Sequence, residues 1–261
     1  MVPLSLNDVK NIELQILTVF DAFCRNNGLR YSLAYGSLIG AVRHHGFIPW
    51  DDDVDIWMPR PDYNAFVNSF TDDRYLFLCH EKSDYWQEFG KITDVLTFAE
   101  PTNNKGMGVF IDVFPVDGLP QKRVIYYKKK LLRQFNIYKR MRSATIWKCD
   151  KSPISLVFKL IDVLHPTKKV FQRFENNKQR HSFNDSVFSW DLYTQFESSD
   201  FDNLIELEFE GKKFFSLANY HKYLRDYYGD YMQYAPLQKR TTGHNYKFYL
   251  ADINTADISD L

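Results

Sequence analysis

Apolar residues recur at helical spacing near the start of the chain. The pattern predicts an amphipathic helix over residues 5–26, which Gly28 ends. Ser5 or Asn7 is suited to cap its first turn. The apolar face of this helix is formed by Ile12, Ile16, Val19, Phe20 and Phe23.

Residues 29–120 then switch between extended and helical patterns. Alternation of apolar and polar residues predicts strands at 29–36, 54–59, 74–80, 88–100 and 107–120. Helical spacing predicts short helices at 36–45 and 60–70. This order of elements predicts an α+β fold, in which a mixed sheet is flanked by helices.

The middle of the chain is strongly basic. Residues 121–151 hold eleven Lys or Arg residues and one acid, Asp150, among apolar residues. This pattern predicts a basic amphipathic helix, and a second helical stretch follows over about 154–180. A solvated helix face explains such a run, and attraction to an anionic membrane or a polyanionic acceptor is the alternative.

The last third of the chain is acidic around 197–210. A helix that ends at Gly229 follows, and Pro236 opens an irregular basic tail. We therefore expect a helical, basic part inserted into the core domain. The expected division is a core at 1–120, a basic helical region at 121–190 and a C-terminal part at 191–261 that completes the core domain.

Composition narrows the class of protein. A chain of 261 residues suits one large domain, or one domain with an insertion. Lys and Arg total 33, as do Asp and Glu, so the charge balance gives no sign of a nucleic-acid partner. Three cysteines without metal-ligand spacing indicate a reducing compartment. Without a signal peptide or an apolar span, we expect a cytoplasmic protein, with peripheral contact at the inner face of the plasma membrane as an option.

Four aspartates directly precede or begin the strand at 54–59. In an extended chain Asp53 and Asp55 point the same way, about 7 Å apart, and Asp51 joins them if the extension starts early. Carboxylates this close repel one another unless a cation lies between them, and Mg²⁺ or Mn²⁺ suits such oxygen ligands. The alternative is a cluster of helix-capping or turn-forming aspartates in a loop.

Two further features suggest phosphate chemistry. Gly36 and Ser37 lie where a strand passes into a helix, and backbone N–H groups at such a junction favour a phosphate. Asp112 lies within an apolar strand, where a carboxylate needs a partner, and it could also take a proton from an attacking hydroxyl. Together with the aspartates, these features form a nucleotidyltransferase (polymerase-β-like) arrangement, which predicts metal-assisted phosphoryl transfer from a nucleotide donor.

Basic residues should complete such a site. Arg43 and His44 lie between the Gly-Ser turn and the aspartates, where they could contact a phosphate or the leaving group. Lys91 either contacts a phosphate or is an exposed strand lysine. Trp50 is interpreted as a core anchor rather than a stacking surface.

The stretch "YSLAYGSLIGAVRHHGFIPWDDDVDIWMPRPDY" closely resembles the signature of the LicD family. These bacterial enzymes transfer phosphocholine from CDP-choline to sugars of surface glycans, and fukutin-type relatives move other alditol phosphates. The later segments "FIDVFPVDGLP" and "YLRDYYGDYM" extend the resemblance over most of the chain. One departure lies in Ala34-Tyr35-Gly36-Ser37, where the family more often has a Gly-Gly-Thr type of turn, so that Tyr35 replaces a glycine while Ser37 keeps the hydroxyl.

The resemblance implies a nucleotidyltransferase-like fold, a donor of the CDP-alcohol type and Mg²⁺ (or Mn²⁺) as cofactor. The implied metal ligands are Asp51, Asp53, Asp55 and Asp112. The family's glycine turn falls on Gly36 and Ser37, and its Arg-His segment on Arg43 and His44. In the expected mechanism Arg43 and Lys91 hold the donor pyrophosphate and Asp112 is the base, while Arg240 and His244 of the family-like tail contact the nucleotide or the acceptor. An exposed tail is the alternative for Arg240 and His244.

Several functions stay open at this point. The favoured function is transfer of phosphocholine, or a similar alcohol phosphate, to a hydroxyl of a glycan or lipid-linked glycan. A donor carrying ribitol or glycerol phosphate is an alternative, and so is a true nucleotidyltransferase that releases pyrophosphate. The non-enzyme alternatives are an inactive binding module and a peripheral membrane protein bound through 121–151.

Overall fold

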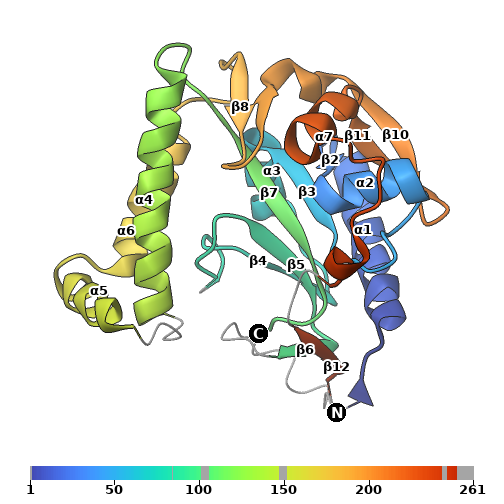
Figure 1. Ribbon diagram of the computed structural model, residues 1–261, viewed down its shortest axis with the longest axis horizontal. Coiled ribbons are helices and arrows are strands. Elements are labelled where there is room, and N and C mark those ends of the chain that lie inside the picture. The colour runs from blue at the N-terminus through green and yellow to red at the C-terminus, as the bar shows by residue number, and fades with distance from the viewer. Residues whose placement is uncertain (1, 84, 101–105, 147–151, 243–245, 252–261) are drawn as a thin grey trace. The chain divides into compact units, whose positions relative to one another are not determined.

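The computed structural model describes residues 2–83, 85–100, 106–146, 152–242 and 246–251 (Figure 1). The chain divides into two compact units. The first unit comprises residues 1–115 and 199–261, and the second comprises residues 116–198. The α+β fold class expected from the sequence is confirmed, since each unit contains both helices and strands.

The first unit is built around a sheet in which the strand order is β2, β3, β7, β5, β4. These strands span Ser32–Leu33 (β2), Asp55–Pro59 (β3), Phe110–Gly118 (β7), Gly90–Asp94 (β5) and Tyr75–Leu78 (β4). The helices of this unit are α1 (Leu6–Asn27), α2 (Tyr35–His44), α3 (Arg60–Ser69) and α7 (Tyr220–Tyr228). Helix α1 contacts β5, whereas α2 and α3 contact β3. The core of the unit therefore lies between this sheet and its helices.

Two smaller sheets complete the first unit (Figure 1). One has the order β1 (Val2–Pro3), β12 (Lys247–Leu250), β6 (Thr97–Glu100). The other is the antiparallel hairpin of β10 (Leu204–Phe209) and β11 (Lys212–Leu217), which contacts α2 and β2. The short 3-10 helices are η1 (Ser198–Asp202) and η2 (Leu237–Lys239). The expected irregular tail after Pro236 is wrong for β12, because its backbone pairs with β1 and β6 on both sides.

The second unit is mainly helical. Helix α4 (Val124–Thr145) contacts both α5 (Pro153–Leu164) and α6 (Thr167–Lys178), and Figure 1 shows α6 alongside α4 and α5 at the lower end of α4. The last residues of β7 pair with β8 (Phe188–Trp190), which pairs with β9 (Gln195–Glu197). In the interior of this unit, the ammonium group of Lys178 lies 3.1 Å from Glu175 and 3.5 Å from Asp117.

The ends of α1 follow directly from the sequence. Ser5 Oγ accepts a hydrogen bond from the Asp8 backbone N–H, and the Asp8 carboxylate accepts one from the Ser5 N–H, which forms a capping box. Gly28 ends the helix with φ of +64°, a conformation that glycine adopts without strain. The predicted helix over 5–26 is therefore confirmed within one residue at each end.

The single helical stretch expected over about 154–180 is wrong, because the structure has two helices there. Pro166 lies between them, and proline can neither donate a backbone hydrogen bond nor let the preceding residue remain helical. The Asp162 carboxylate then caps the next helix, since its Oδ1 accepts hydrogen bonds of 2.6 Å from both the backbone N–H and the hydroxyl of Thr167.

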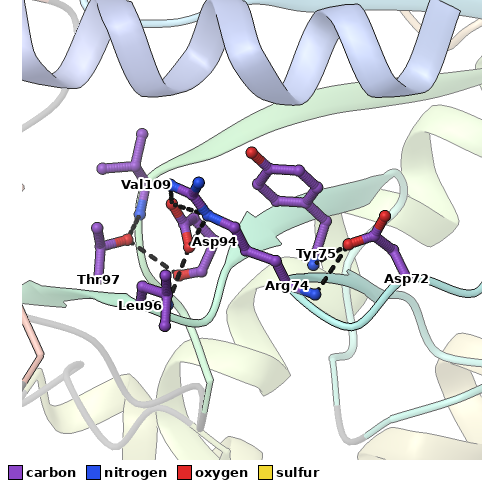
Figure 2. A network of polar contacts seen from close by, with 7 residues as sticks. All are labelled: Asp72, Arg74, Tyr75, Asp94, Leu96, Thr97 and Val109. Carbon is purple, nitrogen blue, oxygen red and sulfur yellow. Dashed lines mark hydrogen bonds and ion pairs between the residues drawn. The ribbon is translucent and has the colours of Figure 1, made fainter. Parts of the chain in front are cut away.

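A polar network fixes the ends of β4 and β5 (Figure 2). The carboxylate of Asp94 is fully buried and accepts a hydrogen bond of 2.7 Å from the Arg74 guanidinium and one of 2.9 Å from the Leu96 N–H. The Thr97 hydroxyl donates to the Asp94 carbonyl and accepts from the Val109 N–H. The network joins the strand that carries Lys91 to the entry of the strand that carries Asp112.

We expect Asp94→Asn to lower the free energy of unfolding by about 2–3 kcal/mol, because a buried, charge-assisted hydrogen bond to Arg74 is lost. Thermal unfolding followed by circular dichroism measures the change. The exposed neighbour Asp73 supplies the matched control, and Asp73→Asn should shift the midpoint little. Equal midpoints for the two variants would contradict the role assigned to the network.

Candidate functional site

The site is built where β3, β7 and β5 lie next to one another in the sheet. Asp55 opens β3, and the Asp112 N–H on β7 donates a 2.8 Å hydrogen bond to the Val54 carbonyl just before it. On the other side of β7, Lys91 of β5 lies in register with Asp112. The sheet therefore brings together two acids and a lysine that are far apart in the sequence.

Lys91 and Asp112 form a buried ion pair. The Lys91 ammonium donates to Asp112 Oδ1, and the two residues are 3 % and 4 % exposed. The same ammonium lies 3.3 Å from the centroid of the Phe110 ring. The sequence-based alternative of an exposed strand lysine is therefore wrong. The structure also gives the Asp112 carboxylate a partner within the sheet.

The Gly-Ser turn at the start of α2 holds the aspartates in place. Ser37 Oγ accepts a 2.8 Å hydrogen bond from the Asp55 N–H, so this hydroxyl fixes the beginning of β3. A Cβ atom added to Gly36 would lie 2.6 Å from Asp51 Oδ2. Only glycine leaves the space that the Asp51 carboxylate occupies.

Three consecutive aspartates could hold a metal ion together. Asp51, Asp52 and Asp53 each offer one carboxylate oxygen, and these oxygens lie within 4.8 Å of one another. Carboxylate oxygens in such a group suit a hard divalent cation such as Mg²⁺. The sequence prediction named Asp51, Asp53 and Asp55 on the basis of strand alternation. Alternation places Asp52 on the opposite face from that set, but the strand begins only at Asp55, so alternation does not govern residues 51–53.

A buried glutamate on α1 completes the acidic cluster, and sequence reasoning missed it. Glu13 is 1 % exposed, and its Oε2 has no hydrogen-bond partner among the described residues. Burial raises the pKa of the Glu13 carboxyl well above its usual value, and the charges of Asp53 and Asp52 raise it further. A single Glu in an amphipathic helix gives no chemical signal. The one sequence feature that could have identified Glu13 is its helical spacing with the apolar residues Ile16 and Phe20, which places it on the buried face of the helix.

The cluster carries far more negative than positive charge. Burial raises the pKa of the Asp55 carboxyl well above its usual range, the charges of Asp53 and Asp112 raise it further, and the Lys91 ammonium opposes the shift. Lys10 contributes a second positive charge near Asp51 and donates to the carbonyls of residues 48 and 49, each at 3.0 Å. Two lysines thus lie among six carboxyl groups, and a bound cation would offset this excess of acidic groups. The six carboxyl groups belong to Glu13, Asp51, Asp52, Asp53, Asp55 and Asp112.

Arg43 and His44 are engaged with the C-terminal part of the first unit. The Arg43 guanidinium donates to the carbonyls of Tyr231 at 2.6 Å and Gln233 at 2.9 Å. Its Nε lies 3.0 Å from His44 Nε2. Burial and the positive charge of Arg43 lower the pKa of His44, so this nitrogen is free to accept the bond. In this structure Arg43 anchors the segment that follows α7.

Of the two site residues predicted in the C-terminal tail, the structure describes Arg240 only. The Arg240 guanidinium lies 5.0 Å from the Trp50 ring centroid and 5.3 Å from that of Tyr234. Trp50 is half-buried, so the predicted core anchor is wrong and the ring is a stacking surface for Arg240. Arg240 Nε donates to the Ala235 carbonyl at 2.7 Å. His244 lies outside the described residues.

Aromatic side chains border the acidic cluster. The Tyr35 ring packs edge-on against Trp57, Phe114 and Tyr227, with centroids 5.0–5.5 Å apart. Tyr228 of α7 is near enough to the aspartates that the charge of Asp55 adds to burial in raising the pKa of its hydroxyl. Tyr35 has φ of +41°, a conformation that glycine tolerates and a tyrosine rarely adopts. This backbone angle suits the glycine that the LicD signature more often has here.

We expect Glu13→Gln to stabilise the metal-free protein, because it removes a buried acid beside three aspartates. The raised pKa means that ionisation of Glu13 destabilises the folded protein, so the gain should be absent below pH 4.5, the usual pKa of this group, and should grow as the pH rises above that value. A gain of about 1 kcal/mol would raise the thermal midpoint by roughly 2–4 °C. The matched control is Glu208→Gln, at an exposed glutamate. A midpoint that falls in Glu13→Gln at neutral pH would contradict the prediction.

Comparison with known proteins agrees with this geometry. Residues 28–141 match the family described as LicD/FKTN/FKRP, nucleotidyltransferase domain. The chain is 29 % identical to lipopolysaccharide cholinephosphotransferase LicD of Haemophilus influenzae, over 96 % of this chain and 100 % of that protein. It is also 26 % identical to an uncharacterized protein of Rickettsia typhi, over 43 % of this chain and 36 % of the relative. Residues 28–141 of this chain thus match the nucleotidyltransferase domain of the LicD/FKTN/FKRP family, and the whole chain is similar in sequence to a LicD protein.

Proposed function

We propose that the protein transfers phosphocholine, or a closely similar alcohol phosphate, from a CDP-activated donor to a hydroxyl group of a cell-surface glycan. The observation that carries the proposal is the cluster of six carboxyl groups and two lysines within a domain of this family. The full-length similarity to a lipopolysaccharide cholinephosphotransferase supports choline phosphate as the group transferred. The polymerase-β-like form of the domain and a glycan acceptor are parts of the same proposal.

The acidic cluster fits Mg²⁺ or Mn²⁺. Its donor set is made only of carboxylate oxygens, and the orphaned Oε2 of Glu13 leaves it incompletely bonded. Asp51, Asp52 and Asp53 would hold the ion, with Asp55 beside them. When bound, the ion would neutralise the donor pyrophosphate and stabilise the departing phosphate oxygen.

The residues of the chain divide the remaining work. Lys91 holds one oxygen of Asp112, which fixes the orientation of that carboxylate. Asp112 positions the acceptor hydroxyl and takes its proton as the hydroxyl oxygen bonds to the phosphorus of the alcohol phosphate. The phosphorus–oxygen bond to CMP breaks, so CMP is the leaving group. Gly36 and Ser37 keep Asp51 and Asp55 in place during the step.

Helix α7 offers an aromatic partner for a cationic alcohol. Tyr227 is 50 % exposed and Tyr228 is 41 % exposed, and their ring centroids lie 4.7 Å apart. Tyrosine faces attract a trimethylammonium group, and such contacts contribute about 0.5–2 kcal/mol. We therefore assign the choline end of the donor to this tyrosine pair.

Isothermal titration with a panel of nucleotides tests the proposal. The panel is CDP-choline, CDP-glycerol, CDP-ribitol and CTP, each with and without Mg²⁺. We expect CDP-choline to bind in a Mg²⁺-dependent manner, and Tyr227→Ala to weaken that binding by roughly tenfold while Tyr227→Phe retains it. CDP-glycerol binding should be indifferent to both variants. Preference for CDP-ribitol or CDP-glycerol would overturn the choline assignment, and binding of CTP alone would indicate a true nucleotidyltransferase.

A further inference from the structure

Helix α5 in the second unit presents its apolar side chains outward. Ser155 is buried, and the Asp162 carboxylate is bonded to Thr167 within the unit. The opposite arrangement is normal for a helix in water, whose apolar stripe faces the core. The outward apolar side chains are 37–79 % exposed and belong to Ile154, Leu156, Val157, Leu160, Ile161, Val163 and Leu164.

Positive charge borders this apolar face. A groove along α4 is lined by four cations together with Leu132, Ile137 and Phe158, and Phe158 belongs to α5. The four cations are Lys129, Arg133, Lys139 and Arg140, all exposed. Lys168 and Lys169 of α6 add two further exposed positive charges within the same unit. Exposed apolar side chains on a helix and lysine and arginine side chains next to them are the two features of a protein segment that binds anionic lipid.

We propose that α5 inserts into the interface of an anionic lipid bilayer, while the cations of α4 contact the lipid headgroups. A helix of twelve residues is about 18 Å long, whereas the hydrocarbon core of a bilayer is about 30 Å thick. Within the described residues, no helix combines the length and the apolar character needed to cross a membrane. The helix therefore lies in the plane of the membrane surface with its apolar face down.

A second copy of the chain is a poorer occupant of this face. One side of a twelve-residue helix supplies only part of the roughly 1,200–2,000 Å² that stable protein interfaces bury. A symmetric dimer through α5 would also bring two sets of α4 cations together, and like charges repel. The basic groove complements an anionic surface instead, and a bilayer offers both charge and hydrocarbon.

Flotation of the full chain with lipid vesicles tests the proposal. The vesicles contain phosphatidylcholine alone or with added phosphatidylglycerol. We expect the protein to float with the anionic vesicles, and the triple variant Leu160→Gln, Val163→Gln, Leu164→Gln to reduce binding at least tenfold. The matched control replaces three similarly exposed apolar residues outside α5, namely Val2, Val187 and Leu237, by Gln, and it should bind as the wild type does.

A variant without the α4 cations tests their contact with the lipid headgroups separately from the insertion of α5. Replacing Lys129, Arg133, Lys139 and Arg140 by Gln should weaken binding to anionic vesicles and reduce its dependence on salt. Failure of the wild type to float, or undiminished flotation of the α5 triple variant, would overturn the proposal. If the wild type sediments as a dimer without lipid and the α5 triple variant sediments as a monomer, the proposal is overturned in favour of a second copy of the chain. No nucleotide is used, so the outcome is independent of the proposed transferase activity.

Discussion

Asp53→Asn should abolish transfer, with kcat/KM reduced by about a thousandfold or more, while the protein stays folded. Asp53 supplies one of three carboxylate oxygens that lie within 4.8 Å of one another, and its charge acts on both Glu13 and Asp55. Asn has the same shape but no charge, so it weakens the grip on a divalent cation without leaving a cavity. Donor-dependent release of CMP and thermal unfolding in the absence of metal are the two measurements.

The two measurements together decide what the cluster is for. Removing one negative charge from a crowded acidic site should leave the metal-free thermal midpoint equal or higher. Asp185→Asn, at an exposed aspartate, is the matched control and should change neither value. A protein that no longer folds would mean that the cluster is structural. Undiminished activity would remove Asp53 from the metal site.

Asp52→Asn and Asp55→Asn refine this result. The geometric group contains Asp52, whereas strand alternation in the sequence favoured Asp55. If Asp52 is a ligand, its amide variant should need a higher Mg²⁺ concentration for half-maximal activity. If Asp55 carries that role, the shift in Mg²⁺ dependence belongs to Asp55→Asn instead.

Local features of the sequence predicted much of the fold. Ser5 and Gly28 marked the ends of α1 because a capping box and a left-handed glycine act over a few residues. The Gly-Ser turn and the aspartates were found because they lie in one short stretch. The break between α5 and α6 was missed, although Pro166 was visible, because the apolar spacing continues on both sides.

Contacts between distant parts of the chain could not be predicted in this way. The sequence marked Asp112 as a carboxylate in need of a partner, but only the register of β5 against β7 identifies Lys91 as that partner. Glu13 reaches the aspartates from a helix that reads as an ordinary amphipathic segment. Arg43 was expected at a phosphate, and its hydrogen bonds instead go to carbonyls nearly two hundred residues later. Pairing of this kind depends on tertiary structure, which spacing does not encode.

The ion pair itself leads to the second large effect. Lys91→Met should lower the free energy of unfolding by about 3–5 kcal/mol, because it leaves the Asp112 charge buried without its partner. Met preserves most of the side-chain volume, so the loss reports charge rather than packing. The effect should extend to Asp55, since the Lys91 ammonium also opposes the rise in the pKa of that carboxyl.

A double-mutant cycle separates the pair from its surroundings. Asp112→Asn in the Lys91→Met background removes the stranded charge and should recover a large part of the lost stability, although the double variant stays inactive. Thermal unfolding measures the coupling between the two positions, and CMP release measures activity. Additive effects of the two substitutions would mean that the ammonium and the carboxylate do not depend on each other. Strong coupling with no recovery of activity would mean that Lys91 stabilises Asp112 in the fold, and that Asp112 is needed in its charged form for transfer.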